Sequence, residues 1–276
     1  MARARKSADV DADAAPEAKT KQTTYAAPAL EKAFEVLDLL SAYPQGALVT
    51  DMATALGRSV GELFRIVVVM EQIGYLQRSP INDRYTVSYK ILDLAYRATP
   101  AQNLTRAATP EMQQLAAETE QSCHFVVPNG AHGLVIAREE NPGMRGFALR
   151  LGAAIDMIHS CSGQVLLAFS SAQRVKRIVA QAGAVQGKPI DLAWLEQRLA
   201  IVREQGFDRR QSPITHGVTD VSYPVFAFSG EIVGALTVPY LELIDGSQRV
   251  KLDAVAGLLR AAAERISLTL GYHPAA

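Results

Sequence analysis

Residues 56–75 read LGRSVGELFRIVVVMEQIGY, a stretch with the signals of a helix that begins just after a tight turn. Gly57 is a residue type that ends helices, and Ser59 followed three residues later by Glu62 is a capping box that begins the next one. Apolar residues then recur at helical spacing and predict a buried face, formed by Leu63, Ile66, Val67, Met70 and Ile73. The stretch predicts the second half of a helix-turn-helix, with an ordinary well-capped amphipathic helix as the alternative.

The sequence upstream favours the helix-turn-helix. An apolar stripe opposite charged residues predicts a first helix that stops before Pro44. The stripe consists of Ala33, Phe34, Leu37 and Leu40. Thr50 is a suitable cap for a short second helix over residues 51–56, and Gly57 supplies the turn into the third helix.

A two-stranded wing is predicted after the third helix. Residues 75–78 and 84–87 carry strand-like patterns, and the segment 79–83 between them contains Pro, Asn and Asp, which favour turns. Three short helices followed by a hairpin are more specific than any one of these elements. We therefore expect a winged helix-turn-helix DNA-binding domain over residues 25–88.

Length and charge bound the remaining possibilities. With 276 residues, of which 49% are hydrophobic, the chain is long enough to fill the cores of two domains. The formal net charge is zero, and residues 25–98 hold seven Lys and Arg against eight Asp and Glu, a local net charge of −1. This balance counts against tight non-specific DNA binding, so specific contacts and dimerisation would have to supply the affinity.

The sequence predicts a soluble cytoplasmic protein with no membrane partner. No apolar run approaches the roughly 20 residues that span a bilayer, and the polar amino terminus lacks the apolar core of a signal peptide. Residues 1–24 contain almost no large apolar side chains and predict a disordered tail, whose basic residues are either solvated or in contact with DNA. Cys123 and Cys161 are too few for a disulfide framework or a thiolate zinc site.

The second half of the chain predicts an α+β domain with an antiparallel sheet flanked by helices. Residues 89–97 have helical spacing, and a second helix is expected to start with Thr109 as its cap and Pro110 in its first turn. The segment 89–108 is thus interpreted as a linker helix region, and 109–272 as an effector-binding domain. Its expected strands are 123–127, 134–137, 147–151, 221–228 and 232–240, and its expected helices are 163–169, 172–182, 192–205 and 247–270.

The chain resembles the IclR family of transcriptional regulators from about Ala29 to Tyr272. The blocks that carry this resemblance are ALEKAFEVLDLL, FRIVVVMEQIGYL, DRYTVSYKILDLA, RLGAAIDMIHSCSGQVLLAF, REQGFDRRQSPITHGVTDVSYPVF and AAAERISLTLGY, in the order of the family. The resemblance implies a second domain similar to GAF and PAS folds that binds a small metabolite. It also implies a homodimer or homotetramer that holds paired winged helices on a double-stranded DNA operator.

The recognition helix departs from the family pattern. Relatives commonly place Thr after the first Ser and His before the Arg, whereas this chain has Val60 and Phe64, which cannot hydrogen-bond to DNA. Phe64 is interpreted as a core or groove-wall residue. Base contacts are expected from Arg58, Ser59, Gly61, Glu62 and Arg65, the last of which matches the family motif directly. Arg78 and Arg84 of the wing are expected to contact phosphates, with solvated hairpin charges as the alternative.

The resemblance places an effector pocket in the second domain. Its lining is expected from Ile155, Met157, His159, Ser160, Cys161, Ser162, Arg210, His216, Asp220, Thr237 and Pro239. The residues themselves support this view, because the hydroxyls and unpaired backbone N–H groups of Ser-Cys-Ser-Gly before an apolar helix suit a carboxylate, and Arg210 can clamp it. Pro239 stands where relatives often have Ser, so the ligand is expected to be less polar at that end. The predicted effector is a small organic acid.

Two alternatives stay open. The residue types of His124, His159, Cys161, His216 and Asp220 can ligate a transition metal or build a Cys-His nucleophile, although their spacing matches no short metal motif. The other alternative is a metabolite-binding or catalytic sensor domain with a degenerate DNA-binding half. The main prediction is a regulator that is not an enzyme, has no metal or cofactor, and couples its effector to operator binding through oligomer geometry.

Overall fold

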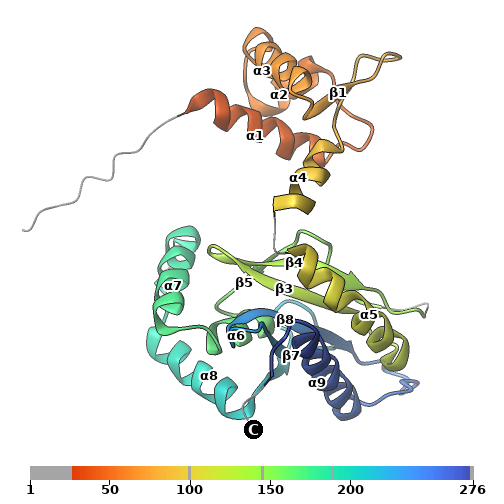
Figure 1. Cartoon of the computed structure of the whole chain (residues 1–276), viewed down its shortest axis with the longest axis vertical. Coiled ribbons are helices and arrows are strands. Elements are labelled where there is room, and N and C mark those ends of the chain that lie inside the picture. Colours follow the sequence, from red (N-terminus) through yellow and green to blue (C-terminus); the bar gives the residue numbers. More distant parts are fainter. Residues whose placement is uncertain (1–26, 99–100, 144–145, 188, 274–276) are drawn as a thin grey trace, which may run out of the picture. The chain divides into compact units, whose positions relative to one another are not determined.

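The computed structural model describes residues 27–98, 101–143, 146–187 and 189–273. The chain divides between Arg97 and Ala98 into two compact units, called here the N-terminal and the C-terminal unit (Figure 1). The tail predicted over residues 1–24 lies outside the described residues. No described helix combines the length and the apolar character that crossing a bilayer requires.

The N-terminal unit is a winged helix-turn-helix, as the sequence predicts. Its elements are α1 (Pro28–Ser41), α2 (Val49–Leu56), α3 (Val60–Gln72), β1 (Leu76–Arg78), β2 (Tyr85–Val87) and α4 (Lys90–Ala98). β1 and β2 pair in antiparallel register to form the wing. The three helices and the wing enclose one apolar core, whose buried members include Val36, Leu40, Met52, Leu63, Val67 and Tyr85.

Local signals set the turn between α2 and α3. Gly57 has a φ of 62° and ends α2 in the left-handed conformation that glycine adopts most easily. The Ser59 hydroxyl accepts a hydrogen bond from the backbone N–H of Glu62 at 3.3 Å. This is one half of the expected capping box. The Glu62 carboxylate, expected to complete the box, pairs with Lys32 of α1.

The expected cap of α2 is wrong. Thr50 lies inside the helix, which begins at Val49. The Asp51 carboxylate accepts a hydrogen bond from the backbone N–H of Leu48 at 3.4 Å and so serves the first turn in its place. Thr and Asp are both good helix-start residues, and their order in the sequence alone does not show which one is used.

Two side chains expected in the core lie at the surface. Phe34 of α1 is 59% exposed, and Val36, which the predicted stripe omits, is buried. Ile73, which follows the last residue of α3, is half exposed. Helical spacing indicates an apolar face, but the neighbouring elements determine which edge of that face is covered.

The described part of the C-terminal unit has a six-stranded antiparallel sheet, in the order β5-β4-β3-β8-β7-β6. The strands are β3 (Cys123–Asn129), β4 (His132–Glu139), β5 (Ala154–Asp156), β6 (Asp208–Gln211), β7 (Val218–Phe226) and β8 (Ile232–Leu241). The helices are α5 (Ala101–Thr119), α6 (Cys161–Ala168), α7 (Ala172–Gln186), α8 (Leu192–Gln205) and α9 (Leu252–Thr269).

Helices cover both faces of this sheet, which gives the predicted α+β fold. α5 and α9 pack side by side on one face, where Met112, Phe125 and Leu259 belong to one apolar core (Figure 1). α6 lies against the other face, and a second core joins it to α7 and α8 through residues such as Val165 and Leu199. The sheet thus separates two apolar layers, and α6 is the helix that contacts its second face most closely.

α5 is longer than expected. It begins at Ala101 rather than at a cap formed by Thr109, and it carries Pro110 in its interior. The proline removes one backbone donor from the helix. α5 continues through it because Ala108 and Met112 are buried against the sheet and α9. Tertiary packing therefore outweighs the local stop signal.

The edges of the sheet also differ from the expectation. Residues 147–151 form no strand, and β5 follows at 154–156. β6 is an additional strand at 208–211. Its charged sequence, DRRQ, lacks the apolar pattern that predicts a strand, but it suits a position at the edge of a sheet. α9 begins at Leu252 rather than near Ser247.

Candidate functional site

The start of α3 is fastened to α1 by two ion pairs, which we call the α1–α3 clamp. Arg58 donates to Glu35 Oε2 from Nε at 2.9 Å and from Nη2 at 2.7 Å. Lys32 Nζ pairs with the Glu62 carboxylate, and this hydrogen bond holds the pKa of Glu62 below its usual value. Two of the side chains expected to contact bases are therefore bound to α1.

The side chains beside the clamp face outward. Ser59 caps α3, and Gly61 and Arg65 are exposed. Phe64 is 50% exposed and Val60 is 46% exposed, so the core interpretation of Phe64 is wrong. The outward surface at the start of α3 combines the Arg65 cation with two apolar side chains.

The wing arginines are held within the N-terminal unit. Arg78 Nη2 lies 2.9 Å from Asp83 Oδ1 across the hairpin. Arg84 Nη1 donates to the Gly46 carbonyl at 2.9 Å and lies 3.9 Å from Asp51 Oδ2. Both arginines keep part of their surface exposed, so their contact with phosphates stays a prediction.

The segment before α6 is a tight turn. The Asp156 carboxylate accepts hydrogen bonds from the backbone N–H groups of Ile158 at 2.7 Å and His159 at 3.1 Å. Ser160 caps α6, because its hydroxyl accepts from the Gly163 N–H at 2.9 Å. The N–H groups of His159 and Gly163 are thus paired within the protein, contrary to the expectation that they are open to a carboxylate.

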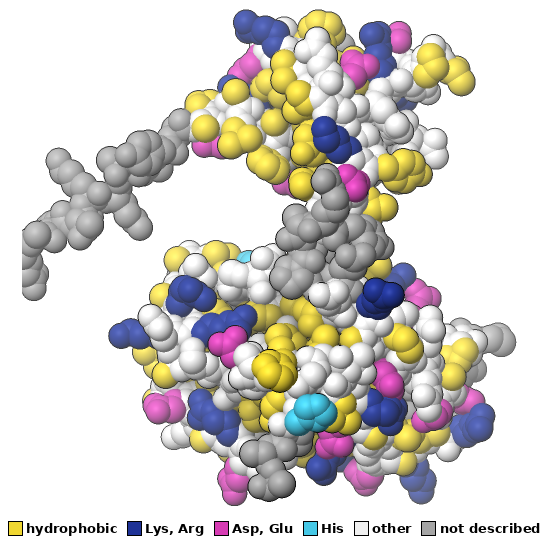
Figure 2. Space-filling view, in the orientation of Figure 1, with side chains coloured by type: hydrophobic (Ala, Val, Ile, Leu, Met, Phe, Trp, Pro, Cys, Tyr) yellow, Lys and Arg dark blue, Asp and Glu magenta, His cyan; other side chains and the backbone are white. Residues whose placement is uncertain are grey.

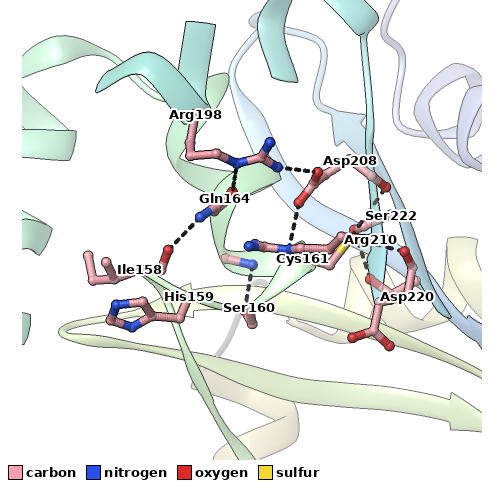
Figure 3. A network of polar contacts seen from close by, with 12 residues as sticks. Ile158, His159, Ser160, Cys161, Gln164, Arg198, Asp208, Arg210, Asp220 and Ser222 are labelled. Carbon is pink, nitrogen blue, oxygen red and sulfur yellow. Dashed lines mark hydrogen bonds and ion pairs between the residues drawn. The ribbon is translucent and has the colours of Figure 1, made fainter. Parts of the chain in front are cut away.

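Asp208 of β6 joins two arginines next to α6 (Figure 3). Arg198 of α8 donates from Nη2 to Asp208 Oδ1 at 2.9 Å, and Arg210 Nε lies 3.1 Å from Asp208 Oδ2. Asp208 is 2% exposed, so the two guanidinium groups balance a buried carboxylate. Arg198 Nε also donates to Gln164 Oε1 at 3.3 Å, which ties α8 to α6.

Cys161 packs against this network as a neutral thiol. Its Sγ lies 3.3 Å from the Asp208 carbonyl oxygen and 3.6 Å from that of Asp220. Burial raises the pKa of the Cys161 thiol well above its usual value and that of Cys123 to about 12. A protonated thiol suits packing and weak hydrogen bonding rather than nucleophilic attack.

A row of polar side chains crosses the sheet on the α6 side. His124 of β3 is opposite Thr237 of β8, Thr237 is opposite Ser222 of β7, and Ser222 is opposite Asp208 of β6. The Ser222 and Thr237 hydroxyls share a hydrogen bond of 2.8 Å. Directly opposite residues of antiparallel strands point to the same face, so the row leads from His124 to the Asp208 network.

His124 is a member of this row with an unsatisfied polar atom. It is 4% exposed, and its Nδ1 is buried without a hydrogen-bond partner among the described residues. Burial lowers the pKa of His124 to about 4, so the imidazole is neutral. The sequence suggests His124 only as a metal ligand, and it does not indicate Gln164, Arg198, Asp208 or Ser222 at all. The alternation of residues 208 and 210 within one strand was the available signal for Asp208.

The other expected effector residues separate into buried and exposed groups. The buried ones are Ile155, Met157, Ser162, Thr237 and Pro239. His159 is exposed and stacks on Trp194 with ring centroids 5.7 Å apart, and His216 is exposed in the loop before β7. The residues that meet on the α6 side of the sheet are Cys161, Arg210, Asp220, Thr237 and Pro239.

The proposed metal ligands do not form a cluster. Within the described ranges, no group of three or more His, Cys, Asp and Glu side chains is arranged to hold a metal ion. His159 and His216 lie at the surface, whereas His124 and Cys161 are buried.

A winged helix-turn-helix followed by a helix-covered antiparallel sheet is the architecture of a two-domain transcriptional regulator. Residues 96–268 match the family model described as bacterial transcriptional regulator IclR C-terminal, and residues 29–80 match the one described as IclR helix-turn-helix domain. The chain belongs to the IclR family, as the sequence blocks predict.

Known relatives agree with this assignment. The HTH-type transcriptional regulator KdgR of Escherichia coli is 23% identical over 228 residues, which cover 82% of this chain and 86% of that protein. XynR of Escherichia coli is 23% identical over 249 residues, covering 88% and 97%. Among solved structures, an IclR homolog from Microbacterium hydrocarbonoxydans complexed with 4-hydroxybenzoate has a TM-score of 0.73 at 20% identity, covering 88% of this chain and 99% of that one. The Thermotoga maritima IclR has a TM-score of 0.66 at 24% identity, covering 88% and 98%.

Proposed function

We propose that the C-terminal unit binds a small organic acid on the α6 side of the sheet and that this binding changes operator affinity. The observation that carries the proposal is Arg210. Its Nε lies 3.1 Å from Asp208 Oδ2 as an ion pair, and both Nε and Nη2 are buried without a hydrogen-bond partner within the described residues. A buried guanidinium nitrogen without a hydrogen-bond acceptor lowers the stability of the folded protein unless a ligand supplies the acceptor. A carboxylate is the acceptor that best matches a guanidinium group.

The surroundings of Arg210 favour an acid with an apolar or aromatic body. Arg210 on β6 is opposite Asp220 on β7, and Asp220 is opposite Pro239 on β8, so an apolar residue lies two strands from Arg210 on the same face of the sheet. The 4-hydroxybenzoate bound by the Microbacterium hydrocarbonoxydans homolog is an acid of this class. The proposal assigns no catalytic step to the site, in line with the protonated state of Cys161.

The N-terminal unit is proposed to place α3 in the major groove, with Arg65 at the bases and the wing arginines at phosphates. Coupling to the effector is proposed to run through a dimer or tetramer. Apolar side chains exposed on α1 and around α4 support this, because a second copy can cover them: Leu30, Phe34, Tyr89, Leu92 and Leu94. Figure 2 shows hydrophobic side chains along the α1 side of the unit.

Replacement of Arg65 by alanine tests the DNA half of the proposal. The exposed guanidinium stands on the outward face of α3, so its loss is expected to weaken binding to an operator selected from random duplex DNA by about 1 to 3 kcal/mol, with thermal stability unchanged. Gln72→Ala, at the exposed far end of α3, is the control and should bind as wild type does. Wild-type affinity of the Arg65 variant would contradict the docking, and failure of the wild type to select any duplex would favour a sensor with a degenerate DNA-binding half.

The effector half predicts binding that strengthens as pH falls. Burial raises the pKa of Asp220 to about 6, against the opposing effects of a hydrogen bond from Ser212 and the charge of Arg210. Ionised Asp220 competes with a ligand carboxylate for Arg210, so 4-hydroxybenzoate should raise the melting temperature more at pH 5.5 than at pH 7.5. Saturation at a hundred times the dissociation constant corresponds to about 2.7 kcal/mol.

Asp220 also makes the stability of the unliganded protein depend on pH. Because its pKa in the folded state lies above the usual value of 3.8, Asp220 favours folding below about pH 4 and loses that contribution as the pH rises through 6. Asp220→Asn should remove both this loss and the pH dependence of ligand stabilisation. Equal stabilisation of wild type and variant at both pH values would show that Asp220 does not face the ligand.

A further inference from the structure

The first turns of α3 expose apolar side chains where a DNA-binding helix usually carries polar ones. Val60 and Phe64 are about half exposed, and their spacing of four residues puts them on the same side of the helix. Leu63 and Val67 already fill the core beneath α3, so the exposed pair is not needed there. Contact with an apolar group of a partner would remove these half-exposed Val and Phe side chains from water, which is favourable.

The α1–α3 clamp narrows the set of residues that can reach bases. Arg58 uses two of its nitrogens on Glu35, and Glu62 is bound by Lys32. Base contact by Arg58 or Glu62 would compete with an ion pair that fixes the start of α3 to α1. Direct recognition therefore falls first to the residues that the clamp leaves outward, which are Ser59, Val60, Gly61, Phe64 and Arg65.

Gly61 adds a second observation. A Cβ at this position would meet nothing within 4 Å, so the protein interior does not require glycine here. The missing side chain instead lowers the helix surface beside Phe64 and Arg65, which follow Gly61 by three and four residues, and lets the helix backbone approach a partner closely. A close approach is what short apolar contacts in a groove demand.

The major groove offers one apolar group to such a surface, the 5-methyl group of thymine. We infer that Val60 and Phe64 recognise thymine methyl groups in the operator half-site, beside the polar contact of Arg65. This inference rests on the proposed docking of α3. Four residues correspond to about 6 Å along a helix, close to two base-pair steps of about 3.4 Å, so the two thymines are expected within about two base pairs of each other.

Replacing thymine by deoxyuridine tests this directly, because it removes the methyl group and leaves base pairing unchanged. The probe is an operator selected by the full-length protein from random duplex DNA, with each thymine replaced singly. Wild type is expected to lose about fourfold in affinity at each contacted thymine, the usual effect of one buried methyl group on a binding constant. Phe64→Ala should bind the thymine and deoxyuridine forms equally at one position, and Val60→Ala at the other.

Two further variants separate recognition from folding. Phe64→Leu keeps an apolar side chain and should retain part of the thymine preference, whereas Val69→Ala removes a half-exposed apolar side chain further along α3 and should leave that preference intact. Thermal melts of all four variants should match wild type, since the replaced side chains are exposed.

The inference is overturned if wild type binds every deoxyuridine form of the operator as tightly as the parent operator. It is also overturned if the discrimination survives in both alanine variants. Arg65→Ala separates failure of the proposed docking from failure of this inference. Normal operator binding by Arg65→Ala would contradict the docking of α3. Weakened binding by Arg65→Ala, together with a wild type that does not distinguish thymine from deoxyuridine, would contradict only the role of Val60 and Phe64.

Discussion

Replacement of Asp208 by alanine is expected to lower the free energy of unfolding of the C-terminal unit by about 3 kcal/mol, near the lower end of the range for breaking a buried ion pair. The carboxylate is almost fully buried and serves both Arg198 and Arg210. Its loss leaves two guanidinium groups without their counter-charge and releases the link between β6 and α8. The lower end of the range applies because both arginines keep about a quarter of their surface in solvent.

A neighbouring pair supplies the matched control. Arg209 Nη1 lies 2.6 Å from Asp253 Oδ1, but the Asp253 side chain is exposed. Asp253→Ala should therefore change the unfolding free energy by less than about 1 kcal/mol. Urea titrations of both variants measure the difference. Similar effects of the two substitutions would mean that burial of Asp208 carries no extra energy.

Gly163→Ala is expected to abolish stabilisation by 4-hydroxybenzoate and to lower the unfolding free energy by about 1 to 3 kcal/mol. A Cβ on Gly163 would lie 2.5 Å from the Asp156 carbonyl oxygen and 2.6 Å from Met157 Cα. Both neighbours are backbone atoms, so the turn before α6 must move as a whole. That turn positions Ser160 and Cys161 against the strands that carry Arg210 and Asp220.

Gly257→Ala is the control for this substitution. Gly257 lies in α9, and a Cβ there would meet nothing within 4 Å. The same exchange should therefore stabilise the protein by about 0.5 to 1 kcal/mol through the better helix propensity of alanine. A Gly163 variant that still responds to the acid as wild type does would show that the turn is not part of the effector site.

The sequence predicted those elements whose signals are local. α8 matches the expected range of 192–205, and the turn at Gly57 and the wing lie where short-range patterns place them. Expectations failed where distant segments compete with local preference. Pro110 continues a helix because α9 and the sheet pack on it, and residues 147–151 carry a strand-like pattern without a strand partner.

The candidate sites depended still more on distant pairing. Arg58 could be placed at the start of the recognition helix from sequence, but its partner Glu35 lies 23 positions away on another helix. The polar row is invisible in the sequence, since His124 and Ser222 become neighbours of Thr237 only through the register of three strands. Family resemblance supplied Arg210 and Asp220 and gave no indication of Asp208.

The ion pairs of the N-terminal unit have a consequence for how the protein searches for its target. Lys32, Arg58, Arg78 and Arg84 each lie beside a carboxylate of the same unit. Sliding along arbitrary DNA depends on cations that displace the condensed counterions of the phosphate backbone. Side-chain cations that are already paired with carboxylates displace few of these counterions. We therefore expect short sliding lengths and rapid release from non-operator sequence. The protein should then find its operator mainly by repeated encounters from solution, and the genome should hold only a small share of it in non-specific complexes.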